Sequence, residues 1–409
     1  MNDAKIINDP VFGFIKIPRG LLYNIVKHPL FQRLGRINQL GLASVVYPGA
    51  RHTRFQHSIG AFHLMSEAIN TLQQKGLFIF DSEAEAVEAA ILMHDIGHGP
   101  FSHVLEHTLI SGISHEDISL LMMEQINRDL GGQLNLAIAI FKDQYPKRFL
   151  HQLISSQLDM DRLDYLRRDS FFTGVTEGNI GSARIIKMLN VVDDRLVIEQ
   201  KGIYSIENYL TSRRLMYWQV YLHKTVIAAD NLLLNVLRRA RELAAAGDSL
   251  GIDFMPLYDF LCHHYTEQDF ISNHQLLDRF ALLDDGDIVM ALKCWMSHPD
   301  TVLRTLSEHL LNRHLSAIRV SDRPFDPAML DTLRTQAQLL YGIGPEESEF
   351  FVGTGKLHNH AYDYNDKEIK VLFKDGTCRD IGDASDQLDR HFLEKQVTKY
   401  YIYYPKSLR

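Results

Sequence analysis

The sequence predicts a mainly α-helical protein, with a helical core over residues 1–245 and a smaller α+β lobe over residues 246–409. Two observations carry this prediction. Amphipathic stretches that end at glycine dominate the first part of the chain. Alternating, strand-like stretches with turn residues between them gather towards the C-terminal end.

The first helices are expected where apolar residues recur with a helical period. Residues 56–76 form one such stretch. In the next, Ser82 and Glu85 have the spacing of a capping box. Val87, Ile91 and His94 then follow at i, i+4 and i+7, which places His94 on the buried face. Glycine and proline end this helix, at Gly97, Gly99 and Pro100.

The rest of the core should hold two more helical regions and a hairpin. Residues 153–170 have the pattern of a third amphipathic helix. Residues 191–206 alternate and carry turn residues, which predicts a short β-hairpin. Residues 206–247 predict a long helical region that closes the core.

The second part of the chain mixes helices and strands. A helical stretch is expected over about residues 256–318. Residues 368–382 have strand patterning around an Asp-Gly turn, and residues 399–406 predict a terminal strand.

Composition narrows the class of protein. The chain has 409 residues, 45% of them hydrophobic and 23% charged, which is ordinary for a globular protein. Its net charge of -8 argues against a generally basic nucleic-acid-binding protein. No apolar run of about 18 residues and no secretory leader is evident, so no membrane span or export is expected. The three cysteines are far apart, which favours a reducing cytoplasm.

The stretch "ILMHDIGHGPFSH", residues 91–103, concentrates imidazoles where a helix breaks. His94 alone is as well explained by a buried histidine bonded to a backbone carbonyl. Together, His57, His94, Asp95 and Asp161 supply two imidazoles and two carboxylates. A nitrogen and oxygen set without thiolate suits a divalent ion such as Mn, Fe, Zn, Ni or Mg.

Two polar stripes accompany these residues. Asp161, Tyr165 and Asp169 follow at i, i+4 and i+8, so they line one helix face. A solvated face is the alternative, but Asp159 and Arg168 are expected to supply the solvated charge. Arg213, Tyr217 and Tyr221 repeat the spacing, with Lys224 one turn on, although aromatic residues at that spacing are often core.

Basic groups near a metal indicate phosphate chemistry. Arginine binds phosphate bidentately, and a divalent ion polarises a phosphoryl oxygen. The candidate basic groups are Arg54, Arg162, Arg213 and Lys224. His103 lies three residues before Glu106, which could raise its pKa and make it a general acid. His98 and His115 are further candidates, although His115 could equally be a polar residue at a helix start.

The ordered H…HD…D set, in "RFQHSIG", "MHDIGHGPFSH" and "LDMDRLDYLRRD", resembles the HD superfamily of metal-dependent phosphohydrolases. Within it, the sequence is most similar to deoxynucleoside triphosphate (dNTP) triphosphohydrolases, over about residues 5–240. The resemblance implies an HD-domain helical core and hydrolysis of a dNTP to deoxynucleoside and tripolyphosphate. It also implies a homo-oligomer.

The resemblance assigns roles residue by residue. It implies that His57, His94, Asp95 and Asp161 hold the metal, and that His98, His103 and His115 surround the α-phosphate. The triphosphate would face Arg54, Arg162, Arg213, Lys224 and Tyr165. The sugar 3′-hydroxyl would meet Gln39 and Asp169, with Leu40 under the sugar and Tyr221 excluding ribose.

The sequence leaves other functions open. Lys27 and Gly35 stand where the vertebrate family member has an acidic residue and an arginine that read an activating nucleotide. A nucleotide effector therefore need not use the same contacts. One alternative is another HD phosphohydrolase, acting on nucleoside monophosphates or other phosphoesters. A second is a non-catalytic module that binds nucleotide or single-stranded nucleic acid, which would have no need of four metal ligands.

Overall fold

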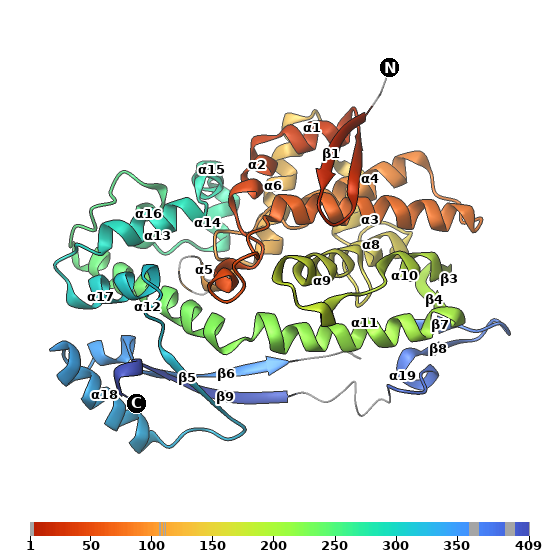
Figure 1. Cartoon of the computed structure of the whole chain (residues 1–409). Helices are drawn as coiled ribbons and strands as arrows, with labels where there is room; N and C mark the ends of the chain where they lie inside the picture. Colours follow the sequence, from red (N-terminus) through yellow and green to blue (C-terminus); the bar gives the residue numbers. More distant parts are fainter. Residues whose placement is uncertain are drawn as a thin grey trace.

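The computed structural model describes residues 4–105, 108, 110, 112–359, 368–388 and 397–408. It is mainly α-helical, with strands concentrated in the C-terminal part, so the predicted fold class is confirmed. Figure 1 shows the helices of the first half stacked above two long helices, with the C-terminal strands and α18 (Pro327–Tyr341) below them. No helix in the described part of the chain has the length and apolar character needed to cross a membrane.

The chain begins with an antiparallel hairpin that the sequence analysis did not predict. It pairs β1 (Ala4–Asp9) with β2 (Gly13–Pro18). Ile15 and Ile17 are buried while their neighbours are exposed, the period-two pattern of a half-buried strand. Helices α1 (Leu21–Lys27) and α2 (Pro29–Gln32) follow, before two short 3₁₀ turns.

Three helices form the frame of the candidate site. The central helix α3 (Arg54–Gln74) packs against both α4 (Asp81–Met93) and α9 (Met160–Thr173). Thr53 caps α3 in a reciprocal capping box with Gln56. The remaining helices of this part are α5 (Ser102–Leu105), α6 (His115–Asp129), α7 (Asn135–Phe141) and α8 (Arg148–Ile154).

Two local predictions about these helices were wrong. Helix α4 starts at Asp81, and the Glu83 carboxylate accepts the Phe80 N–H at 2.9 Å, so the Ser82–Glu85 capping box does not form. Residues 153–170 are not one helix either, because residues 155–159 interrupt it. The Asp159 side chain accepts the Arg162 N–H at 2.7 Å and starts α9 afresh.

Asp159 and Arg168 were also wrongly expected to be solvated, because both are fully buried. Asp159 forms an ion pair with Arg162. Arg168 pairs with Asp164 at 2.9 Å and with Asp9 of β1 at 2.7 Å. Buried charges persist when they are paired in this way. The missed N-terminal hairpin thus supplies part of the electrostatic support of α9.

The later core elements agree with prediction. Helix α10 (Ser182–Met188) leads into an antiparallel hairpin of β3 (Leu189–Val192) and β4 (Arg195–Glu199), as predicted. The long helical region is present as α11 (Ile203–Met216) and α12 (Lys224–Ala246). A π-helical turn, Tyr217–Tyr221, separates the two, and such turns are frequent at functional sites.

The C-terminal part begins with five helices, and strands together with α18 and α19 (Ile381–Ala384) follow; the helical stretch expected to residue 318 ends at Leu311. The helices are α13 (Pro256–Cys262), α14 (Glu267–Ser272), α15 (His274–Leu282), α16 (Asp285–Trp295) and α17 (Thr301–Leu311). Strand β9 (Val397–Tyr404), the predicted terminal strand, lies between β5 (Ala317–Ser321) and β6 (Gly353–Asn359). All three strands run antiparallel to their neighbours.

The predicted hairpin around Asp375 and Gly376 is also present, as β7 (Lys370–Leu372) and β8 (Cys378–Asp380), followed by α19 (Ile381–Ala384). Strand β7 pairs in parallel with β4, so one four-stranded sheet joins the middle of the chain to its C-terminal part. The boundary placed after residue 245 stays a prediction, and α12 packs on α17 across it.

One buried carboxylate of this C-terminal part should limit stability at neutral pH. Asp285 of α16 is 8% exposed; its Oδ2 accepts the Asn38 N–H at 2.9 Å, and burial raises its pKa to about 6. A folded-state pKa above the ordinary value of about 4 means that the folded protein binds this proton more tightly. The stability that this group contributes is therefore fully present below pH 4 or so and is lost as the pH rises through about 6.

Asp285→Asn is expected to raise the free energy of unfolding at pH 7 by about 1–3 kcal/mol. The gain should shrink towards pH 4, because the amide keeps the acceptor for Asn38 without the charge. Urea denaturation at both pH values checks this. Exposed Asp322→Asn is the matched control and should change little. A destabilised Asp285→Asn variant at pH 7 would show that the charge itself is needed.

Candidate metal centre and surrounding site

Two histidines present one ring nitrogen each to a common point. His57 lies in the first turn of α3, and His94 directly follows α4. The His57 Nδ1 bonds Asp164 Oδ2 at 2.7 Å, and the His94 Nδ1 bonds the Ile91 carbonyl at 2.7 Å. Because each Nδ1–H donates to an oxygen, each neutral ring keeps its lone pair on Nε2. This is the tautomer that a metal ion requires.

The spacing of the converging atoms fits one bound ion. The two Nε2 atoms lie 3.3 Å apart, and Asp161 Oδ1 lies 3.1 Å from that of His57 and 3.4 Å from that of His94. Asp95 carboxylate oxygens lie 3.7 Å and 3.5 Å from the same two nitrogens. Ligand atoms that share one ion at bonds of about 2.0–2.2 Å lie roughly 3–3.5 Å apart. His57, His94 and Asp161 could therefore hold a metal ion, with Asp95 beside them.

The charges of the cluster also favour a cation. Burial alone would lower the pKa of His57, but its hydrogen bonds to Asp161 and Asp164 outweigh burial and raise it to about 10. For Asp161, burial would raise the pKa, yet the hydrogen bonds from His57 and His94 lower it. Asp161 and Asp164 thus stabilise a proton, and its positive charge, on His57. A divalent ion would take the place of that proton, so the residues fit such an ion.

Asp95 has partners on both sides of the cluster. Arg54 Nη1 lies 2.6 Å from its Oδ2, and His98 Nδ1 lies 3.4 Å from its Oδ1. Burial would raise the pKa of Asp95, but His98, His94 and Arg54 hold it well below its usual range. Arg54, predicted to face the triphosphate, is therefore placed against a candidate metal ligand.

The candidate proton-transfer residues are only partly described. The rings of His98 and His115 lie 3.9 Å apart between centroids. His115 is the first residue of α6, so it is both a helix-start residue and a neighbour of the cluster. The backbone of His103 lies in α5, whereas its side chain and all of Glu106 lie outside the described residues. Their proposed roles stay predictions.

A close approach of backbone holds the histidine loop in place. A Cβ on Gly97 would collide with the His115 carbonyl and the Ser119 N–H of α6. The Ser119 hydroxyl accepts the Gly97 N–H at 2.9 Å and donates to the His94 carbonyl at 2.9 Å. Glycine is needed here because α6 lies directly on the turn.

The predicted sugar-contacting residues are brought together. The Gln39 N–H donates to the His52 carbonyl at 2.9 Å, beside a bridge between Asn38 and Thr53. His52 Nε2 lies 2.8 Å from Asp169 Oδ1, and the Tyr221 hydroxyl donates to Asp169 Oδ2 at 2.7 Å. Leu40, expected under the sugar, is partly buried in the same turn.

The tyrosines of the two predicted polar stripes, Tyr165, Tyr217 and Tyr221, lie close together. Ring centroids of Tyr165 and Tyr217 lie 6.2 Å and 5.2 Å from that of Tyr221. Tyr217 is half-buried, so it is not a core residue. Arg213 Nη1 donates to Gln157 Oε1 at 2.7 Å. Lys224 is the exposed first residue of α12, and no described contact joins it to the metal cluster.

Sequence reasoning missed the residues that support this site from behind. Asp164 orients His57, His52 orients Asp169, and Gln157 holds Arg213. Gly60 is also explained by this layer, because a Cβ there would collide with Asp164 and Arg168. The only available signal was chemical: a metal-ligating histidine needs an acceptor for its second nitrogen.

Comparison with known proteins agrees with this geometry. Residues 54–169 match the HD domain family, and residues 180–259 match the HD associated region. "Uncharacterized protein YwfO" of Bacillus subtilis is 30% identical, over 100% of this chain and 94% of that protein. Deoxynucleoside triphosphate triphosphohydrolase SAMHD1 of Homo sapiens is 31% identical, over 63% of this chain and 49% of its own length.

A solved structure extends the likeness to the whole chain. The crystal structure of a phosphohydrolase from Bacteroides thetaiotaomicron is 60% identical and superimposes with a TM-score of 0.94. The match covers 98% of this chain and 99% of that one. With the buried His57–His94–Asp161 cluster at its centre, the chain therefore belongs to the HD superfamily of phosphohydrolases, whose HD domains bind divalent metal ions.

Proposed function

We propose that the protein hydrolyses deoxynucleoside triphosphates to deoxynucleoside and tripolyphosphate with a divalent metal ion. One arrangement carries the proposal: Asp161, the carboxylate of the His57–His94–Asp161 cluster, stands on the same helix, α9, as Arg162 and Asp169. Residues within three turns of one rigid helix would then contact the phosphoryl group, neutralise its charge and bind the sugar.

The metal site would be held by His57, His94, Asp95 and Asp161. A divalent ion supplies Lewis-acid polarisation of a phosphoryl oxygen and activation of water. The protein's own contribution is orientation. Asp164 and the Ile91 carbonyl fix the two rings, so that both Nε2 atoms face the position where the ion would be held.

Two arginines with buried Nε atoms, Arg162 and Arg213, support a polyanionic substrate. Arg162 and Arg213 each have one hydrogen-bond partner on the protein, yet the Nε atoms of both have none among the described residues. Buried donors of native proteins nearly always find an acceptor. Phosphate oxygens would supply it with charge-assisted hydrogen bonds. Arg54 and Lys224 would complete the triphosphate contacts by the family resemblance.

The residues around Asp169 support a deoxyribose. Asp169 accepts from Tyr221, and the Gln39 Oε1 is buried without a partner in the described structure. A sugar hydroxyl would donate its hydrogen to one of these two acceptors. The Tyr221 ring, fixed by its bond to Asp169, would leave no room for a 2′-hydroxyl.

Proton transfer to the leaving 5′-oxygen is assigned to the histidines near Asp95. The rings of His98 and His115 lie side by side next to the cluster, and His103 follows in α5. The human relative is named as a deoxynucleoside triphosphate triphosphohydrolase, and this name supports the proposed substrate class. The expected homo-oligomer, the nucleotide effector and the cytoplasmic location stay predictions.

The test is a product analysis with metal-loaded protein. Each of the four dNTPs and four NTPs is incubated with Mn²⁺, Fe²⁺, Zn²⁺, Ni²⁺ or Mg²⁺, and products are separated by ion-exchange chromatography. We expect tripolyphosphate and deoxynucleoside from at least one dNTP, with ribonucleotides slower. Orthophosphate released from monophosphates, with no tripolyphosphate from any dNTP, would favour another HD phosphohydrolase activity. An Arg213→Ala variant should lose dNTP hydrolysis while the metal content is kept.

A further inference from the structure

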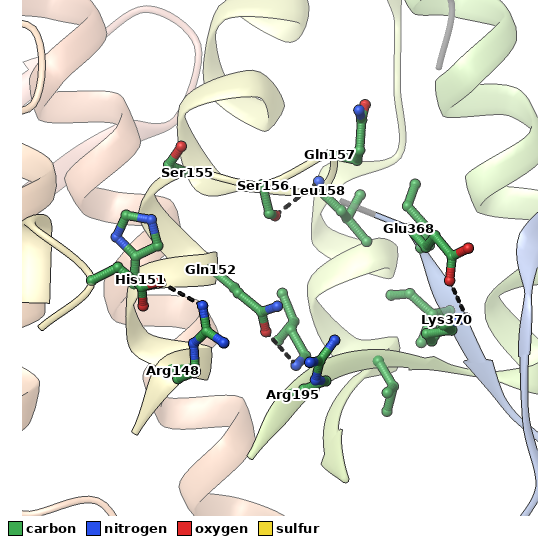
Figure 2. Close-up of a pocket in the computed structure, with 15 residues that line it drawn as sticks. Arg148, His151, Gln152, Ser155, Ser156, Gln157, Leu158, Arg195, Glu368 and Lys370 are labelled. Carbon is green, nitrogen blue, oxygen red and sulfur yellow. Dashed lines mark hydrogen bonds and ion pairs between the residues drawn. The ribbon is translucent and has the colours of Figure 1, made fainter. Parts of the chain in front are cut away.

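A separate cavity of about 370 Å³ is lined in part by Gln157, the residue that holds Arg213. Helix α8, the 155–158 segment and strands β4 and β7 line it (Figure 2), so it sits where the parallel β4–β7 pair joins the middle of the chain to its C-terminal part. None of its lining residues belongs to the predicted metal or substrate site. Small-molecule sites are typically about 300–1,000 Å³, so the cavity is large enough for a small organic ligand.

One side of the cavity carries positive charge. Figure 2 shows Arg148, Arg195 and Lys370 along one edge, with Ser155, Ser156 and Gln157 opposite. The two lining carboxylates are already engaged, Asp143 by Arg148 at 2.7 Å and Glu368 by Lys370. Arg195 forms no ion pair within the described ranges. Three cations against two carboxylates make a local positive surplus in a chain of net charge -8.

The remaining wall is apolar and well fixed. Leu158, Val197, Ile198 and Ile369 line it, and all four are buried. The Leu196 N–H donates to Gln152 Oε1 at 2.8 Å, which ties β4 to α8. A bare inorganic anion would use only the charged edge. A molecule with a phosphate at one end and a ring at the other would use both surfaces.

The 155–158 segment connects this cavity to the candidate active site. Gln157 lines the cavity, its carbonyl accepts the Tyr209 hydroxyl at 2.8 Å, and its side chain accepts Arg213 at 2.7 Å. Asp159, two residues on, accepts the Ser156 N–H at 2.8 Å and pairs with Arg162. The segment therefore contacts Arg213 and Arg162 on one side and lines the cavity on the other.

We propose that this cavity binds a phosphorylated organic molecule, with its phosphate at Arg195, and that occupancy orders residues 155–159 and so positions Arg213 and Arg162. The binding is independent of the proposed dNTP hydrolysis. Only the consequence for catalysis rests on that proposed function.

Binding is tested by isothermal titration calorimetry on the full chain. The probes are AMP, GMP, CMP, UMP, glucose 6-phosphate and inorganic phosphate. For at least one organic phosphate we expect a site that Arg195→Glu weakens at least about tenfold, the loss expected for a charge-assisted contact. Arg323→Glu, the same charge change at an exposed residue outside the cavity, should retain it. The affinities for the nucleotides and for glucose 6-phosphate, compared with each other, distinguish a nucleotide ligand from a sugar phosphate.

The coupling has its own readout. Amide hydrogen exchange over residues 155–162 should slow when the bound probe is present, in wild-type protein and not in Arg195→Glu. Absence of any saturable site, binding that survives Arg195→Glu, or inorganic phosphate binding as tightly as every organic phosphate would overturn the binding site. Unchanged exchange would overturn the coupling. A protein that hydrolyses no dNTP but keeps Arg195-dependent binding would refute the proposed function alone.

Discussion

Asp161→Ala is expected to abolish metal binding and phosphohydrolase activity together. Asp161 Oδ1 is the atom that lies within 3.1 Å and 3.4 Å of both histidine Nε2 atoms, so its loss opens the cluster. A metal ion contributes several kcal/mol of charge stabilisation in phosphoryl chemistry. At 1.36 kcal/mol per factor of ten, we expect turnover to fall by roughly 10³-fold or more. Elemental analysis of the purified variant should show the ion lost.

The matched control is Asp331→Ala, which removes an exposed carboxylate from α18. It should keep both metal and activity. Circular dichroism establishes that Asp161→Ala remains folded, which is expected because both imidazoles keep the acceptors of their Nδ1 atoms, Asp164 and the Ile91 carbonyl. A folded Asp161→Ala protein with an unchanged metal content would contradict the assignment of this cluster.

Asp164→Ala should cause the largest loss of stability among single changes in the site. Asp164 is fully buried between His57, at 2.7 Å, and Arg168, at 2.9 and 3.0 Å. Its removal leaves the buried Arg168 guanidinium with Asp9 as its ion-pair partner among the described residues. Breaking a buried pair by removing one partner costs about 3–5 kcal/mol. Chemical denaturation of the apoprotein measures the loss.

The same change should weaken metal binding, because the His57 Nδ1 loses its acceptor. Loss of such an outer-shell partner typically costs about 10–100-fold in metal affinity. Competition with a metal chelator measures the metal affinity, without denaturant and at a temperature at which the variant is folded. Asp164→Asn keeps an acceptor oxygen for His57 and should recover part of the affinity, but not the ion pair. Equal metal affinity in all three proteins would confine Asp164 to a structural role.

Much of the fold follows from local patterns. The helical period over residues 56–76 and 206–247, and the alternation around Asp375 and Gly376, predicted elements that the structure contains. The failures are equally local in origin. Residues 153–170 were expected to form one helix because the apolar period continues through them. The competing effect is the Asp159 side chain, which caps a new helix and forms a buried ion pair.

From the sequence, only those site residues could be predicted whose side-chain type itself suggests metal or phosphate chemistry. His57, His94 and Asp161 stood out because two imidazoles and a carboxylate suit one ion, and the structure brings them together. Asp164, His52 and Gln157 could not be found in this way. Each acts on a residue 56 to 117 positions away, so nothing in its own neighbourhood marks it.

By itself, then, the sequence determined the helices, the predicted C-terminal strands and the set of residues able to bind an ion, because periodicity, capping and ligand chemistry are properties of neighbouring residues. Tertiary structure alone decided which buried charges are paired, which nitrogen of each histidine faces the cluster, and that a cavity backs onto Gln157. The reason is physical. A buried polar group is stable only with its partner, and the packing of distant elements chooses that partner.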